Sequence, residues 1–280
     1  MEKKIRVTLP KRILEIIECD IEEFKIKKNT LLNYIYEELG KTYDFKNYKS
    51  NYKGETEVIQ FNLNKKNKID YYGFLEENNI QNEAEFFREI LIEYAEKGKK
   101  NRELFLFRNI VERLQIAIKE KRISKLSFKD GKEVEIEPYY LESSKLELAN
   151  YIFCYNLKEE SWKNYKLKYI QSVYLKKESF KVRDKSFIDS VKKDFDPFLS
   201  KGKVVKVKLT VDGEKLFKEL TTNKPRLLSR EGNIYTLECS EEKAKRYFSF
   251  FIDEVEILEP KNLREWFKEK YKKALLKYKD

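Results

Sequence analysis

The sequence predicts a multidomain α+β protein, because strand and helix patterns combine in different ways along its 280 residues. A strand followed by two helices occurs twice within the first hundred residues. A block of short alternating strands follows from about residue 123, and strands and helices mix from residue 197 to the end. We therefore expect separate folding units with different architectures.

Each copy of the repeated segment opens with a two-faced strand. The first copy, residues 1–40, alternates the apolar residues Ile5, Val7 and Leu9 with the polar residues Lys4, Arg6 and Thr8. The second copy, residues 58–100, alternates Ile59, Phe61 and Leu63 with Gln60, Asn62 and Asn64. Because side chains alternate across a strand, each strand buries one face and exposes the other.

A short isolated strand is unstable, so each of these strands needs a partner and helices over its apolar face. Antiparallel pairing of the two gives a ribbon whose outer face carries all six polar side chains. Arginine suits the guanine edge, asparagine and glutamine suit adenine, and a two-stranded ribbon fits the major groove. The alternative is two unrelated helical hairpins, each preceded by a strand.

These segments resemble the ribbon-helix-helix family. In the first copy the likeness rests on residues 5–10, on Ile13, Ile16, Ile17 and Ile21, and on residues 29–33. In the second copy it rests on residues 61–63, 69–70, 74–76 and 82–91. Family members complete the ribbon by dimerising. The resemblance therefore implies a pseudodimer within the chain or strand exchange between chains.

The segment between the copies, residues 41–57, interleaves lysines with aromatic residues and has no periodicity. Its aromatic residues are Tyr43, Phe45, Tyr48 and Tyr52. Such a segment can follow a phosphate backbone while its rings stack on unpaired bases. The alternative is a linker that returns the chain across the four-helix unit and tucks its aromatic residues underneath.

Composition predicts a cytoplasmic binder of polyanions. Lys and Arg outnumber Asp and Glu by 60 to 49, a formal net charge of +11. No apolar run is long enough to span a membrane, so no membrane association is expected. Three distant cysteines, Cys19, Cys154 and Cys239, indicate a reducing compartment. Each has apolar neighbours, which predicts a small core residue.

The absence of histidine excludes large classes of enzyme. Catalytic triads, histidine metal ligands and histidine acid–base catalysis all require an imidazole. The sequence also has no CxxC pair and no phosphate-binding glycine loop. We therefore predict no catalytic residue, no metal site and no cofactor. A carboxylate-based, metal-dependent nuclease remains the enzymatic alternative, although no acidic cluster marks one.

The β-rich block, residues 123–196, follows a linker helix predicted over residues 101–122. It resembles a WYL domain, which has a small Sm-like β-barrel. The likeness rests on Phe128, Asp130-Gly131, residues 137–141, Tyr151-Ile152 and residues 163–170. The tryptophan of the family's naming triplet is replaced by Asn150.

The resemblance places a ligand or nucleic-acid site on this barrel. The predicted site residues are Tyr151, Lys163, Tyr165, Lys166, Lys168 and Tyr169. Family arginines fall on Lys163 and Lys166, which puts bidentate ligand binding in doubt because lysine is a point charge. Alternation would place Lys166 and Lys168 on one face and Tyr165 and Tyr169 on the other. An ordinary solvated outer face is the alternative.

Residues 197–280 follow a βαββαβ-like order that resembles the ferredoxin-like extension common after WYL domains. Asp212 and residues 240–243 are the expected helix starts. The closest stretch is residues 255–265. Extensions of this kind mediate dimer contacts, so the resemblance implies a homodimer.

Together these features predict a non-enzymatic, nucleic-acid-binding regulator. The pairing of ribbon-helix-helix and WYL resembles the accessory proteins of RNA-targeting type VI CRISPR effectors. It implies single-stranded RNA and such an effector as partners. The alternative is a transcriptional regulator that binds duplex DNA and senses a ligand through its WYL domain. A purely structural or protein-interaction module agrees less well with the charge.

Overall fold

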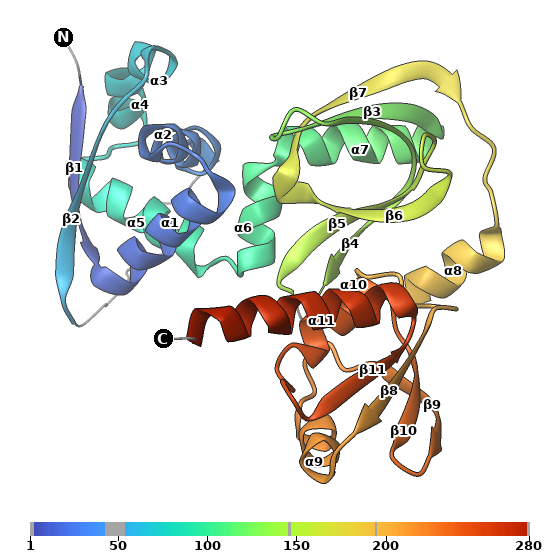
Figure 1. Ribbon diagram of the computed structural model, residues 1–280. Coiled ribbons are helices and arrows are strands. Elements are labelled where there is room, and N and C mark those ends of the chain that lie inside the picture. Colours follow the sequence, from blue (N-terminus) through green and yellow to red (C-terminus); the bar gives the residue numbers. More distant parts are fainter. Residues whose placement is uncertain (1–2, 43–53, 145–146, 194, 279–280) are drawn as a thin grey trace. The chain divides into compact units, whose positions relative to one another are not determined.

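The computed structural model describes residues 3–42, 54–144, 147–193 and 195–278 (Figure 1). The chain separates into two compact units, Met1–Leu106 and Phe107–Asp280. Its strands pair antiparallel in separate sheets and helices stand between them along the chain, which confirms the predicted multidomain α+β class. The predicted aromatic residues at 43, 45, 48 and 52 lie outside the described residues.

The first unit consists of one ribbon and several helices on one side of it (Figure 1). Its elements are β1 (Lys4–Pro10), α1 (Lys11–Phe24), α2 (Lys28–Glu38), a 3₁₀ turn (Gly40–Thr42), β2 (Thr56–Asn62), α3 (Lys65–Ile69), α4 (Tyr71–Glu77), α5 (Glu83–Glu96) and α6 (Lys99–Leu106). The second copy therefore differs from the first, because two short helices, α3 and α4, precede its long helix.

β1 and β2 pair antiparallel within the chain, with Arg6 opposite Gln60. The predicted apolar faces are buried: Ile5, Val7 and Leu9 are fully enclosed, and Ile59 and Phe61 are each 3% exposed. Each large apolar side chain removed from water contributes roughly 1.5–3 kcal/mol. The hydrophobic face therefore fixes the register, because a one-residue slip would expose it.

A buried ion pair ties α6 to this core. Arg102 donates to both carboxylate oxygens of Asp20, at 2.6 and 3.1 Å, and the Tyr94 hydroxyl donates to the same carboxylate at 2.7 Å. Asp20 is 2% exposed. A buried charge requires such partners, so removal of either member of the pair would destabilise the unit.

The predicted linker helix over residues 101–122 is two helices. α6 ends at Leu106, and α7 (Arg108–Glu120) begins after Phe107, whose backbone leaves the helical region. The physical reason is that the two helices bury different faces. α6 buries Arg102 and Glu103 in the first unit, whereas α7 buries Leu114 and Ala117 in the second.

The second unit starts with a five-stranded antiparallel sheet in the order β6-β5-β4-β3-β7. Its elements are β3 (Arg122–Phe128), β4 (Glu133–Ser144), β5 (Ala149–Asn156), β6 (Ser161–Lys166), a 3₁₀ turn (Leu167–Tyr169), β7 (Ile170–Ser179) and α8 (Lys185–Lys193). β5 is buried almost throughout, which explains its nearly continuous apolar sequence.

The remainder of the chain forms a four-stranded antiparallel sheet in the order β11-β8-β10-β9. Its elements are β8 (Val204–Leu209), α9 (Val211–Glu219), β9 (Arg226–Glu231), β10 (Ile234–Glu238), α10 (Glu241–Phe248), β11 (Val255–Glu259), α11 (Lys261–Leu275) and a 3₁₀ turn (Leu276–Tyr278). Ser240 caps α10 as predicted, but Thr210 and not Asp212 caps α9.

The cysteines are only partly as predicted. Cys154 and Cys239 are buried, and burial raises the pKa of both thiols, so neither is activated. Cys19 is exposed, so its assignment to the core was wrong. It lies on α1 outside the stripe formed by Ile13, Leu14 and Ile17, which faces the core.

Candidate nucleic-acid interface

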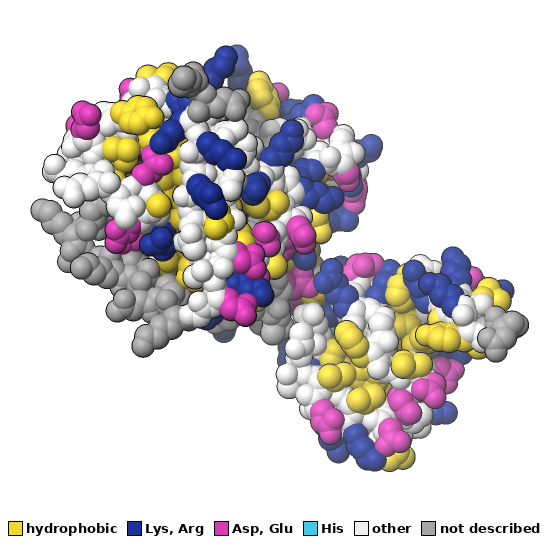
Figure 2. Space-filling view, turned by 90° about the vertical axis from the view of Figure 1, so that its left-hand side faces the viewer, with side chains coloured by type: hydrophobic (Ala, Val, Ile, Leu, Met, Phe, Trp, Pro, Cys, Tyr) yellow, Lys and Arg dark blue, Asp and Glu magenta, His cyan; other side chains and the backbone are white. Residues whose placement is uncertain are grey.

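The outer face of the ribbon carries the polar side chains that the sequence predicted there. Lys4, Arg6 and Thr8 are exposed on β1, and Gln60 and Asn62 are partly exposed on β2. Lys4 lies opposite Asn62. Figure 2, which views the molecule from this side, shows Lys and Arg side chains gathered over the first unit. The face therefore combines cations with amide groups.

Asn64, the sixth predicted residue, lies beyond the end of β2 and caps α3. Its side-chain oxygen accepts from the Asn67 backbone N–H at 2.8 Å. Its own backbone N–H donates to Asn33, which is 3% exposed and also donates to the Asn62 carbonyl at 2.9 Å. The side chain of Asn64 is thus engaged in capping α3, beyond the end of β2.

The two halves of the ribbon unit differ in charge at the start of their last helices, α2 and α5. α2 begins after Lys27 with Lys28, whereas α5 begins with Glu83 and has Glu85 in its first turn. A helix N-terminus attracts anions, and carboxylates in the first turn cancel that attraction. Only the α2 side therefore favours a phosphate group.

The structure separates the predicted site residues of the five-stranded sheet. Tyr151 is the register partner of Lys166, whereas Lys163 and Tyr165 lie opposite Cys154 and Ile152. Since neighbours along a strand point to opposite faces, Tyr151 and Lys166 lie on one face of the sheet. Lys163 and Tyr165 lie on the other face. The 3₁₀ turn at Leu167–Tyr169 then ends the alternation before Lys168. The predicted single strip of lysines beside a strip of tyrosines does not form.

Tyr151 and Lys166 are committed to a buried carboxylate. The Tyr151 hydroxyl donates to Glu147 at 2.7 Å, and the Lys166 ammonium lies 2.5 Å from it. Arg246 of α10 donates to its other oxygen. Burial by itself would raise the pKa of Glu147, but the Lys166 and Tyr151 hydrogen bonds and the neighbouring cations outweigh burial and lower it.

The remaining predicted residues differ in availability. Lys163 pairs with Glu159 at 2.6 Å, and the Tyr165 hydroxyl accepts from Asn156 at 2.7 Å inside the sheet. The Lys168 ammonium lies 5.3 Å from the ring centre of Tyr169, which is 53% exposed. Lys168 and Tyr169 are the members of this set that present a cation and a ring together at the surface.

A basic groove that the sequence did not predict lies between the five-stranded sheet and the four-stranded sheet, with a volume of about 670 Å³. We call it the polyanion groove. Its cationic residues are Lys192, Lys193, Lys201, Lys224, Arg226 and Lys243, and its acidic residues are Glu142, Asp196 and Glu238. Phe187 and Phe195 also line it. The groove thus combines excess positive charge with aromatic surface.

Most of the negative charge in the groove is already paired. Lys243 lies 3.5 Å from Asp196, and Arg226 lies 3.6 Å from Glu238. Lys192, Lys193 and Lys201 are exposed, and within the described part of the chain none of them has a carboxylate at ion-pair distance. These three ammonium groups remain for an anionic ligand.

Local packing explains how these lysines come together. α8 buries Ile188 and Val191 against Tyr140 and Phe153, which leaves Lys192 and Lys193 on its last turn facing solvent. The following segment is held at Asp196, whose carbonyl accepts from Asn164 of β6 at 3.2 Å. The adjacent lysines at 192–193 were the only sequence signal, because the other cations come from distant elements.

The described residues contain no group of three or more possible metal ligands. Among the helices within these same ranges, none is long and apolar enough to cross a bilayer. Chemically, the cations of these surfaces suit phosphate groups, and their amide and aromatic groups suit bases.

Taken together, the chain is a multidomain α+β protein with a ribbon, two sheets and basic surfaces. No protein-family model matches it, and no curated protein matches it. It shares its fold with the crystal structure of a CRISPR Cas-related protein, with a TM-score of 0.75 and 14% identity over 99% of this chain and 94% of that one. Proteasome accessory factor B/C (PafBC) of Arthrobacter aurescens aligns with 62% of this chain and 28% of its own length, with 19% identity and a TM-score of 0.33.

Proposed function

We propose that this chain is a non-enzymatic regulator that binds single-stranded nucleic acid, with RNA as its ligand. The polyanion groove carries the proposal. Its three exposed lysines, Lys192, Lys193 and Lys201, can neutralise phosphates, and Phe187 and Phe195 offer rings within the same groove. Cations that follow a backbone beside rings that accept bases are the usual means of binding unpaired strands.

The domain resemblances support this function. We infer that the first unit is a ribbon-helix-helix pseudodimer, because two strand-helix copies pair their strands within one chain. The order β6-β5-β4-β3-β7 after α7 agrees with an Sm-like WYL barrel. The order β11-β8-β10-β9, with its βαββαβ sequence of elements, agrees with a ferredoxin-like extension.

The shared fold with a CRISPR Cas-related protein supports a role beside a CRISPR effector. We propose that the effector is of the RNA-targeting type VI, since an accessory of such an effector would require binding of single-stranded RNA.

We further propose a homodimer. The end of α11 supports association, because Leu275 and Leu276 are 62% and 57% exposed there.

A second function, regulation of transcription through duplex DNA, is favoured by the ribbon. Lys4, Arg6 and Gln60 share its outer face, and they match the side-chain types that contact base edges in the major groove. The two functions use different surfaces. They can therefore be separated by variants.

The test compares single-stranded RNA and duplex DNA by fluorescence anisotropy at two salt concentrations. A Lys192→Glu/Lys193→Glu variant should bind RNA more weakly and keep its affinity for any duplex held by the ribbon. Its salt slope should fall by about 0.7 for each phosphate that the variant no longer neutralises. The matched control is Lys158→Glu/Lys177→Glu, which makes the same charge change at exposed positions outside the groove.

Equally weakened RNA binding in both variants would show that net charge and not the groove governs binding. Duplex binding without RNA binding by the wild-type protein would overturn the proposal and support the transcriptional regulator.

A further inference from the structure

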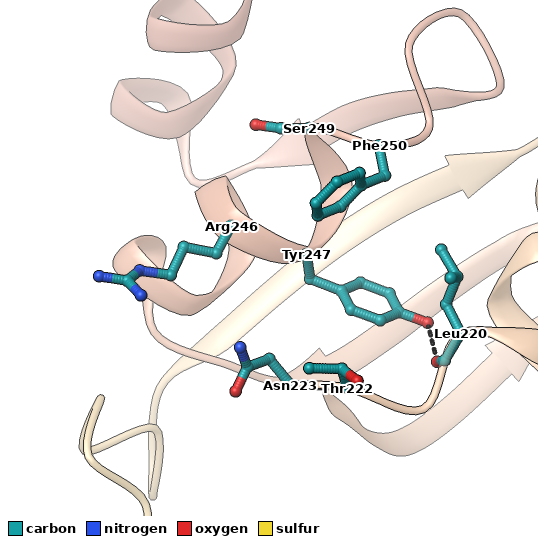
Figure 3. Close-up of a pocket in the computed structure, with 7 residues that line it drawn as sticks. All are labelled: Leu220, Thr222, Asn223, Arg246, Tyr247, Ser249 and Phe250. Atoms are coloured by element: carbon teal, nitrogen blue, oxygen red, sulfur yellow. Dashed lines mark hydrogen bonds between the residues drawn. The ribbon is translucent and has the colours of Figure 1, made fainter. Parts of the chain in front are cut away.

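The four-stranded part of the second unit contains a second cavity, about 630 Å³ in volume. It is lined by Leu220, Thr222, Asn223, Arg246, Tyr247, Ser249 and Phe250 (Figure 3). Figure 3 shows Arg246 and Asn223 on one side and the rings of Tyr247 and Phe250 on the other. The pocket therefore has a polar side and an aromatic side.

The two rings differ in their freedom to bind. Tyr247 is 2% exposed and its hydroxyl donates to the Leu220 carbonyl at 2.9 Å, so it forms a fixed wall. Phe250 is 75% exposed, although a large aromatic side chain is normally buried. Its ring can therefore cover a flat ligand that enters the pocket.

Asn223 provides the polar recognition group. Its backbone has a φ of 57°, a left-handed conformation that asparagine tolerates better than most residues. Its side-chain amide has no hydrogen-bond partner among the described residues, so both its donor and its acceptor are available. An amide with both groups free can pair with the edge of a nucleobase.

Asn223 lines the polyanion groove as well as this pocket, so the two cavities adjoin at this residue. Lys224, the next residue, also lines the groove. The Arg246 guanidinium is held by Glu147 and lies 5.0 Å from the ring centre of Phe198. Lys224 therefore places a cation beside the point at which the groove and the pocket adjoin.

We propose that this pocket binds one unpaired base of a strand that lies in the polyanion groove. Phe250 stacks on the base, Tyr247 forms the opposite wall, and Asn223 contacts the base edge. The site rests on the proposed binding of single-stranded nucleic acid. It assigns a base-binding role to the C-terminal part of the chain, whereas the sequence placed nucleic-acid contacts only in the ribbon, the linker and the barrel.

The test uses a single-stranded RNA of about 12 nucleotides, within the usual site size, with one adenine replaced by 2-aminopurine. Emission of this base falls when it stacks on an aromatic ring. Wild-type protein should quench the emission, and Phe250→Ala should restore it and weaken binding by about 5- to 150-fold. Asn223→Gly, which keeps the backbone conformation accessible, should reduce the difference in affinity between homopolymers of different bases.

The control is Ile252→Ala, which removes another exposed apolar side chain from the same loop outside the pocket. RNA binding and quenching by Phe250→Ala equal to those of the wild type would overturn the base pocket. If Phe250→Ala instead altered the sedimentation of the protein and left RNA binding intact, the pocket would be an interface between copies, and the proposal would fail. Absence of RNA binding by the wild type would refute the proposed function itself.

Discussion

Gly213 illustrates how a close approach between backbone segments constrains a single residue in the C-terminal part of the chain. It lies in the first turn of α9, where a Cβ atom would approach the Glu254 carbonyl oxygen to 2.2 Å. No real Cβ tolerates that distance, and the obstacle is backbone, so the chain itself would have to shift. Gly73 of α4, in contrast, has nothing within 4 Å of the equivalent position.

These two glycines give opposite predictions for alanine. Gly213→Ala should destabilise the second unit by about 1–3 kcal/mol through overpacking. Gly73→Ala should stabilise the first unit by up to about 1 kcal/mol, because alanine favours the helix. Denaturant unfolding followed separately for each unit checks both, and a stable Gly213→Ala protein would contradict the close approach.

Glu147 gives a pH-dependent prediction at the same scale. Its pKa is below the ordinary value of 4.5 because of Lys166, Tyr151 and Arg246. The ionised Glu147 carboxylate therefore stabilises the fold fully above pH 4.5. This contribution is lost as the pH falls through the lowered pKa of the folded state. Glu147→Gln should lower the free energy of unfolding near neutral pH by about 1–3 kcal/mol. On acidification the variant should lose less of that free energy than the wild type.

Urea unfolding between neutral pH and pH 3 measures this difference. Glu159→Gln is the control, because the ion pair between Glu159 and Lys163 is solvent-exposed. The explanation for the lowered pKa would be wrong if Glu147→Gln and the wild type lost the same stability on acidification.

At the scale of elements, we propose the ribbon as the surface that binds duplex DNA if the protein regulates transcription. Replacement of Arg6, Gln60 and Asn62 by alanine should weaken binding of a selected duplex by about 1–3 kcal/mol for each base that is no longer recognised. The fold should survive, because the buried faces of β1 and β2 are unchanged. Competition anisotropy measures the change in affinity.

A Lys65→Ala/Gln81→Ala variant serves as the control, since it removes a cation and an amide from exposed positions outside the ribbon. Unaltered duplex affinity in the ribbon variant would show that this face does not bind duplex DNA. A selection from random duplexes that enriched no sequence would lead to the same conclusion.

At the scale of the whole molecule, we predict that the protein does not cleave nucleic acid. The sequence contains no histidine, and the described residues bring no three possible metal ligands together. Purified protein should leave labelled RNA and DNA intact with Mg²⁺ or Mn²⁺. Cleavage that required the metal, scaled with protein concentration and persisted after repurification would contradict this prediction.

Several features of the fold were predictable because they depend on local periodicity. Alternating apolar residues defined the buried faces of β1 and β2, and Ser240 with its neighbours defined the start of α10. Such signals lie within a few residues of one another. The positions of Lys4, Arg6 and Gln60 on the exposed face follow from the same alternation.

Other features required the tertiary structure. A strand pattern cannot show that the 3₁₀ turn at Leu167–Tyr169 interrupts alternation, or that Glu147 engages both Lys166 and Arg246. The adjoining groove and pocket are formed by residues from separate elements, including Lys193, Asn223 and Phe250.

The sequence by itself determined the fold class, the buried faces of the ribbon and the excess of positive charge. Each of these depends on residue type and short-range spacing. The tertiary structure decided which cations remain unpaired and which cavities they line. That outcome depends on packing between distant elements, because an ammonium group binds whichever carboxylate the fold brings within reach.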